Sequence, residues 1–316
     1  MHPALSVIVF TTASGAGYGL LALTGLVFAA GGFAAMHWGF GFCAIGLGTA
    51  LVAGGLVSST LHLGRPERAL RALTQVRTSW LSREGALAAL AFLPILGFFA
   101  GWVLMGRIDG PVRLAALAVA LLSVATVHAT AMIYRSLKPV HQWCNGHVVP
   151  VYHVLAALTG ALLLNALAHL WGAPSQALAA FALLACAAGA FLKERYWRFV
   201  DEDAAASTPE TATGLAGLGK VRLLDPPHTG SNYVMREMGF RVARKHALKL
   251  RRAALLLGFV LPALLLLAAV LLAPVPATIA ATLAPASALA GVLAERWLFF
   301  AEARHSVSLY YGAEAA

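Results

Sequence analysis

The sequence LHLGRPERA at residues 61–69 marks the point where a long apolar segment changes to a short basic one. The segment before it, residues 39–63, contains no Asp, Glu, Lys or Arg. A bilayer-spanning helix needs about 20 predominantly apolar residues. Residues 39–63 therefore predict a membrane span, with the imidazole of His62 just inside the membrane edge and Arg65 and Arg68 just outside it. This arrangement suits a site where an amphiphilic, proton-carrying molecule enters from lipid.

The composition extends this conclusion to the whole chain of 316 residues. Hydrophobic residues make up 60% and charged residues only 11%, whereas a soluble globular chain carries about 25% charged residues. Eight segments have the length and apolar character of a span: residues 5–30, 39–63, 86–105, 112–134, 148–170, 175–192, 253–272 and 278–300. We predict an all-α polytopic membrane protein with about eight transmembrane helices. Residues 1–200 would hold the first six, residues 201–248 an extramembrane connection, and residues 249–316 the last two.

The positive charge is distributed unevenly between the two sides. Eight spans put both termini on one side, together with the second, fourth and sixth connections. Nearly all Lys and Arg residues lie there, whereas only Arg107 and Arg113 lie opposite. The positive-inside rule then predicts an inner-membrane protein whose termini and large basic connection are cytoplasmic. The net charge of +10 thus reflects topology, and we expect no nucleic-acid partner.

Two of these connections have recognisable patterns. In the second, Leu70, Leu73, Val76 and Trp80 recur at helical spacing between arginines, which predicts a short amphipathic helix in the membrane interface. The sixth, of about 50 residues, is too short for an independent core and is expected to pack on the membrane domain or on a partner protein. It ends in a basic helical stretch, residues 235–252, suited to anionic lipid or to an acidic partner.

Four titratable groups are predicted at one depth near the cytoplasmic side: His62, Glu84, His128 and His153. A quinone site needs such groups, because each quinone oxygen gains or loses a proton as electrons pass, and histidine titrates near neutral pH. Other roles are open. The histidines could be interhelical hydrogen-bonding residues, the arginines topology determinants, and Glu84 a helix N-terminal charge following Ser82. His128 and His153 could also ligate a b-type haem.

Other classes of function lack their usual signals. No acidic residue is predicted at the centre of a span, which argues against an ion-driven transporter, although a small-molecule transporter is retained as the rival from another class. The three cysteines, Cys43, Cys144 and Cys186, have no paired spacing that would hold an iron–sulfur cluster. No metal-ligand cluster, catalytic triad or nucleotide-binding loop is visible, so no metal site is predicted.

Three stretches resemble the dimethyl sulfoxide reductase membrane-anchor family: TLHLGRP at residues 60–66, RTSWLSRE at 77–84 and AMIYRSLKP at 131–139. The likeness covers essentially the whole chain. It implies a subunit that holds a molybdopterin catalytic subunit and an iron–sulfur subunit at the membrane, exchanges electrons with quinone and carries no haem. In this family the histidine of the Leu-His-Leu-Gly motif and the glutamate soon after it belong to the quinol site. Here these residues are His62 and Glu84.

The resemblance and the residues together give a functional hypothesis. The chain is the quinone-reactive subunit of an oxidoreductase complex, with no molybdenum site of its own and with ubiquinone or menaquinone as exchangeable substrate. His62 hydrogen-bonds the quinone and handles a proton, Glu84 relays protons, and Arg65 and Arg68 orient the site. The cytoplasmic orientation favours the sulfite:quinone oxidoreductase branch of the family. The alternative within the family is the anchor of a dimethyl sulfoxide-type reductase that uses menaquinol.

Overall fold

The computed structural model describes residues 4–33, 36–61, 65–202, 207–225, 230 and 242–314, with the backbone alone at residues 66, 68–70, 72 and 242–245. Within these ranges all regular structure is helical, and eight helices are long and apolar enough to cross a membrane. They are α1 (Leu5–Ala29), α2 (Trp38–Thr60), α3 (Trp80–Phe99, continued by a π-helical turn to Leu104), α4 (Gly110–Arg135), α5 (Val148–Leu170), α6 (Gln176–Glu202), α9 and α10 (Val242–Leu255 and Leu261–Leu271, joined by a π-helical turn) and α11 (Pro274–Ala301). The predicted all-α fold with eight spans is confirmed.

The third span begins at Trp80, six residues earlier than predicted. The Oγ of Ser79 accepts a hydrogen bond from the backbone N–H of Ser82 at 3.3 Å, and such a cap satisfies one of the free N–H groups at a helix start. Ser79, not Ser82, therefore caps this helix, and Glu84 lies inside the span. Trp80 consequently belongs to α3, and the second connection contains the 3-10 helix Pro66–Gln75 instead of an amphipathic helix that reaches residue 80.

The sixth and seventh helices also differ from their predicted limits. α6 continues to Glu202 and so carries Lys193 within its length. Of the predicted basic helical stretch 235–252, the structure describes residues 242–252, which form most of α9, and residues 235–241 lie outside the described residues.

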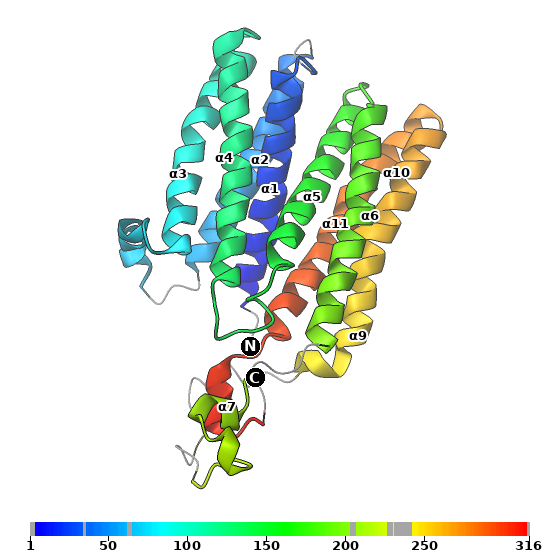
Figure 1. Cartoon of the computed structure of the whole chain (residues 1–316). Helices are drawn as coiled ribbons and strands as arrows, with labels where there is room; N and C mark the ends of the chain where they lie inside the picture. Colours follow the sequence, from blue (N-terminus) through cyan, green and yellow to red (C-terminus); the bar gives the residue numbers. More distant parts are fainter. Residues whose placement is uncertain are drawn as a thin grey trace.

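Two groups of helices form the bundle, with α1–α4 on one side and α5, α6, α9, α10 and α11 on the other (Figure 1). α1 joins the groups, because it packs against α2, α4, α5 and α11. Its closest crossing is with α5, where a Cβ at Gly19 would lie 1.9 Å from the carbonyl oxygen of Ala156 and one at Gly160 would lie 2.2 Å from the carbonyl carbon of Gly19. Glycines at such crossings let membrane helices approach backbone to backbone.

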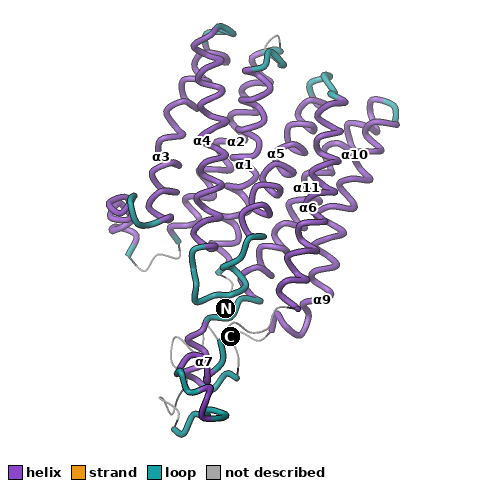
Figure 2. The backbone as a smooth tube through the Cα atoms, in the orientation of Figure 1, coloured by secondary structure: helices purple, strands orange, loops and turns teal. Residues whose placement is uncertain are grey.

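The two ends of the bundle differ. The first and last described residues lie at the same end as α7 (Pro209–Thr213) and the longer connections (Figure 1). At the opposite end the helices are joined by short turns (Figure 2). This arrangement agrees with an even number of spans. We call the end with the termini the connection end.

Large apolar side chains cover the outside of the helices. Among them, Leu93 is 66% exposed, Leu114 is 69% and Leu184 is 70%. A soluble monomer rarely exposes a continuous apolar surface of this kind. The outer surface is therefore the lipid-facing surface of a multi-pass membrane protein.

Candidate functional site

A groove with a volume of about 770 Å³ runs between α3 and α4. Its size is in the range of small-molecule sites, about 300–1,000 Å³. Several lining side chains, such as Leu90 and Leu121, also belong to the exposed outer surface, so the groove opens towards lipid. Most of the lining is aliphatic: Leu26, Val76, Ala86, Leu87, Leu90, Ala120, Leu121, Val124, Ala125 and Ala129.

The polar residues of this α3–α4 groove are close to one another. The ring centroids of Trp80 and His128 are 6.0 Å apart, and those of His128 and His153 are 5.6 Å apart. The Nδ1 of His153 lies 3.0 Å from the carbonyl oxygen of Val149. A carbonyl can only accept, so Nδ1 carries the hydrogen and the Nε2 of neutral His153 is an acceptor. The groove thus offers an aromatic ring and two imidazoles to a polar head group.

Arg83 connects the groove to the second connection. Its guanidinium lies 4.3 Å from the ring centroid of Trp80, a cation–π contact. Its Nε donates to the carbonyl oxygen of Val76 at 2.9 Å, and its Nη2 donates to that of Arg77 at 2.8 Å. Val76 itself lines the groove. The second connection therefore covers the polar end of the groove.

Glu84 lies beside this groove, within the interface between α3 and α4. Its side chain is buried, and its Oε1 accepts a hydrogen bond from the hydroxyl of Thr130 on α4. The same hydroxyl lies 3.0 Å from the carbonyl oxygen of Thr126, one turn earlier in α4. Glu84 is one helical turn from Trp80, but it is not among the residues that line the groove. Its carboxyl group faces Thr130 on α4.

The structure describes only some of the predicted site residues. Glu84 lies against α4 as described, and Arg65 is exposed and does not line the groove. His62 lies outside the described residues, as does the side chain of Arg68. His128 and His153, which the sequence placed at one depth, are in ring contact.

A second set of polar residues, missed by the sequence analysis, is buried between α5, α6 and α11. The Nζ of Lys193 lies 2.5 Å from the Oε1 of Glu295, and the Nη2 of Arg296 donates to the same oxygen at 2.8 Å. All three side chains are at most 2% exposed. We call them the buried charge cluster. The sequence signal was the Glu295-Arg296 pair inside an otherwise apolar segment, and ionisable residues in a span are functional candidates by default.

Eight apolar helices within the described residues, a groove open to lipid and an extramembrane connection define a polytopic membrane protein. Residues 1–312 match the family described as DMSO reductase anchor subunit (DmsC). The chain belongs to this family, as the resemblance indicated. It is also 33% identical, over 327 aligned residues, to a subunit of the sulfite dehydrogenase of Allochromatium vinosum; the alignment covers 98% of this chain and 99% of that protein. The chain is thus a membrane anchor subunit of a multi-subunit oxidoreductase.

Proposed function

We propose that this anchor is the quinone-reactive subunit of a molybdopterin and iron–sulfur oxidoreductase, and that it passes electrons between the iron–sulfur partner and the quinone pool. The observation that carries the proposal is the α3–α4 groove, which is apolar along its length, open to lipid and ends at Trp80, His128 and His153. A quinone has the matching chemistry, because its isoprenoid tail is apolar and its head carries two hydrogen-bonding oxygens.

The polar end of the groove supports a division of roles. His128 donates a hydrogen bond to one quinone oxygen, and Trp80 packs against the ring. Glu84 exchanges protons with the bound head group. His62, Arg65 and Arg68 belong to the same connection as Val76 and Arg77, which cover this end of the groove through Arg83. We therefore retain His62 as a second hydrogen-bonding group and the two arginines as residues that orient the head group and attract negative charge on it.

The location of the groove supports docking of the partners at the connection end. Trp80 and Arg83 lie in the first turn of α3, beside the second connection. Residues 201–248 would dock the iron–sulfur subunit, which in turn holds the molybdopterin subunit. Within this connection Leu218 is 87% exposed and Leu224 fully exposed, and exposed apolar side chains of this size fit a protein interface.

Sulfite is the electron donor that we favour for the complex. The charge asymmetry favours a cytoplasmic connection end, and the relative from A. vinosum is named a sulfite dehydrogenase subunit. Electrons would then run from sulfite to ubiquinone or menaquinone. The second candidate is the anchor of a dimethyl sulfoxide-type reductase, in which electrons run from menaquinol to the partner.

The proposal is tested on the complex purified from native membranes through a tag on this chain. We expect a molybdopterin subunit and an iron–sulfur subunit to co-purify, and sulfite to reduce a short-chain quinone. His128→Gln should lower this quinone-linked turnover by about a hundredfold, the lower range for an acid–base group, and leave dye-linked sulfite oxidation intact.

His169→Gln is the matched control, because His169 does not line the groove and lies at the opposite end of the bundle from the groove's polar end. Equal quinone-linked turnover in the two variants would contradict the role of His128. A chain that purifies alone and turns over no quinone would refute the proposed function and favour the transporter class.

A further inference from the structure

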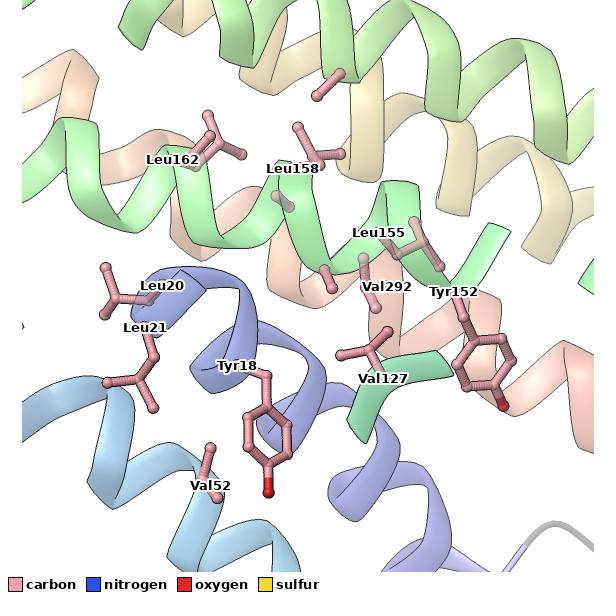
Figure 3. Close-up of a cluster of buried hydrophobic side chains, with 14 of the residues drawn as sticks. Tyr18, Leu20, Leu21, Val52, Val127, Tyr152, Leu155, Leu158, Leu162 and Val292 are labelled. Atoms are coloured by element: carbon pink, nitrogen blue, oxygen red, sulfur yellow. The ribbon is translucent and has the colours of Figure 1, made fainter. Parts of the chain in front are cut away.

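A small cavity lies on the other side of α4 from the groove and is lined by residues of α1, α4, α5 and α11. Its volume is about 20 Å³, room for one water molecule, which needs about 10–15 Å³ measured in this way. The polar side chains around it include Thr12, Ser14, Tyr18, Thr130, Tyr152 and Arg296. Figure 3 shows the helices that supply Tyr18, Val127 and Tyr152.

The hydroxyl groups around this polar cavity indicate that it holds water. Within the part of the chain that the structure describes, the hydroxyls of Thr12, Tyr18 and Tyr152 are buried and make no hydrogen bond of ordinary geometry. Tyr18 has the hydroxyl of Thr126 near it, and Tyr152 has the guanidinium of Arg296. Burying a hydroxyl without a partner is unfavourable, and an internal water commonly supplies the missing bonds. Three such groups around one cavity of this size satisfy the requirement for two to four polar partners.

The polar cavity contacts Glu84 at one end and the buried charge cluster at the other. Thr130, whose hydroxyl is bonded to Glu84, lines the cavity. Arg296 lines it too, with its guanidinium 4.2 Å from the ring centroid of Tyr152. Arg296 is in turn bonded to Glu295. A proton acceptor beside the groove and a buried carboxylate in the other half of the bundle are thus separated by one hydroxyl-lined cavity.

The buried charge cluster lies close to charged residues at the connection end, and Glu302 is near enough to Lys193 to interact with it electrostatically. The ring of Trp197 lies 4.6 Å from the Nζ of Lys193 on one side and 5.5 Å from the guanidinium of Arg251 on the other. Arg251 is paired with Asp201 at 2.6 Å and with Glu302 at 2.9 Å, and the side chain of Asp201 is 56% exposed. Burial raises the pKa of the Glu302 carboxyl above its ordinary value, outweighing the opposing effect of Arg251. Glu302 therefore suits proton exchange closer to neutral pH.

We propose that the polar cavity and the buried charge cluster form a proton route between Glu84 and the Asp201–Glu302 surface. The proposal rests on the proposed function. When the quinone is reduced, it takes two electrons from the iron–sulfur partner and two protons from the protein. Each proton that leaves the Glu84 carboxyl is replaced through Thr130 and the cavity water, and Glu295 and Lys193 pass on the proton that Asp201 or Glu302 takes up at the surface. Arg296 and Arg251 keep their protons throughout and hold the carboxylates in place. Quinol oxidation would use the same groups in reverse.

Threonine on α1 offers a matched pair of variants. Thr12 and Thr24 are both buried, and both hydroxyls lack a partner within the described residues. Only Thr12 lines the polar cavity, and Thr24 is three turns, roughly 18 Å, further along the helix. Thr12→Val and Thr24→Val therefore remove the same group at a similar burial, inside and outside the route. Tyr152→Phe is the second test variant, because it removes only the hydroxyl.

The experiment measures quinone-linked turnover of the whole complex in H2O and in D2O, with dye-linked activity as the control for assembly. We expect Thr12→Val and Tyr152→Phe to lower quinone-linked turnover about tenfold or more and to raise its solvent isotope effect, because proton delivery becomes limiting. Thr24→Val should resemble the unaltered complex in both values.

Three outcomes would overturn the route. If Thr12→Val and Tyr152→Phe match Thr24→Val in quinone-linked turnover and in solvent isotope effect, the polar cavity carries no protons. A lower rate with an unchanged isotope effect would show that Thr12 and Tyr152 are structural. Both outcomes leave the proposed function standing. An unaltered complex without any quinone-linked turnover would instead remove the proposed function and the route together.

Discussion

Replacing Glu295 by Gln should destabilise the bundle far more than replacing Lys193 by Met, although both changes remove one charge from the same pair. With Glu295 the cluster holds two cations and one anion, and the carboxylate bonds both cations, at 2.5 Å and 2.8 Å. Glu295→Gln leaves Lys193 and Arg296 buried without a counter-charge. Lys193→Met leaves one neutral Arg296–Glu295 pair and keeps an apolar stem of similar length.

The expected magnitudes follow from this difference. Leaving a buried charge without its partner costs about 3–5 kcal/mol, and Glu295→Gln does so for two cations. Lys193→Met loses one charge-assisted hydrogen bond, about 1.5–3 kcal/mol, and its cation–π contacts with Tyr196 and Trp197, and it gains from no longer burying an ammonium group. Since about 1 kcal/mol lowers the Tm of a chain of 150–250 residues by roughly 2–4 °C, Glu295→Gln should lower the Tm by more than about 10 °C and Lys193→Met by less than half as much.

Thermal unfolding of the purified chain in one detergent, followed by tryptophan fluorescence, measures this difference. Arg195→Met, two residues from Lys193 on the exposed surface of α6, is the control for removing a cation from that helix, and it should leave the Tm nearly unchanged. The reasoning would be refuted if Glu295→Gln melted at the same temperature as Lys193→Met, because the carboxylate would then not be neutralising the cluster.

Three further predictions concern other parts of the chain. Ala125→Phe should narrow the α3–α4 groove and raise the KM for quinone at least tenfold, whereas Leu117→Phe, on the exposed face of α4 outside the groove, should leave the KM unchanged; equal KM values would show that quinone binds elsewhere. Gly160→Ala should separate α1 from α5 and lower the Tm by several degrees, since its Cβ would meet the backbone of Gly19 at 2.2 Å; an unchanged Tm would contradict the close crossing. The purified chain should show no Soret band, because we propose no haem, and a band that shifted on reduction would support bis-histidine ligation by His128 and His153.

Hydropathy alone predicted the eight spans, because lipid exposure requires a long apolar segment for each crossing. The limits of α3 and α6 were less accurate for a shared reason. Arg83-Glu84 and Lys193-Glu194-Arg195 look like the charged ends of spans in the sequence. In the folded chain Glu84 is bonded to Thr130 and Lys193 to Glu295, so both helices continue through these residues. Partners of this kind are distant along the chain and leave no local signal.

The candidate site could be predicted only in part, because the sequence gives the depth of a residue along its helix but not the face that it shares with other helices. Depth along each helix can be counted from the sequence, and this placed His128 and His153 in one layer. Which faces of α4 and α5 turn towards each other depends on how the whole bundle packs, including the crossing of α1 and α5 at Gly19 and Gly160. The groove and the polar cavity therefore became visible only in the folded chain, as did the link between Glu84 and the buried charge cluster.

The most direct test of the account is where quinone binds. A photoreactive quinone analogue, cross-linked to the purified complex and mapped by mass spectrometry, should label peptides of α3 and α4 around Trp80 and His128, and excess unlabelled quinone should suppress this labelling. Competed labelling confined to other helices, or to the partner subunits, would contradict the assignment of the groove as the quinone site.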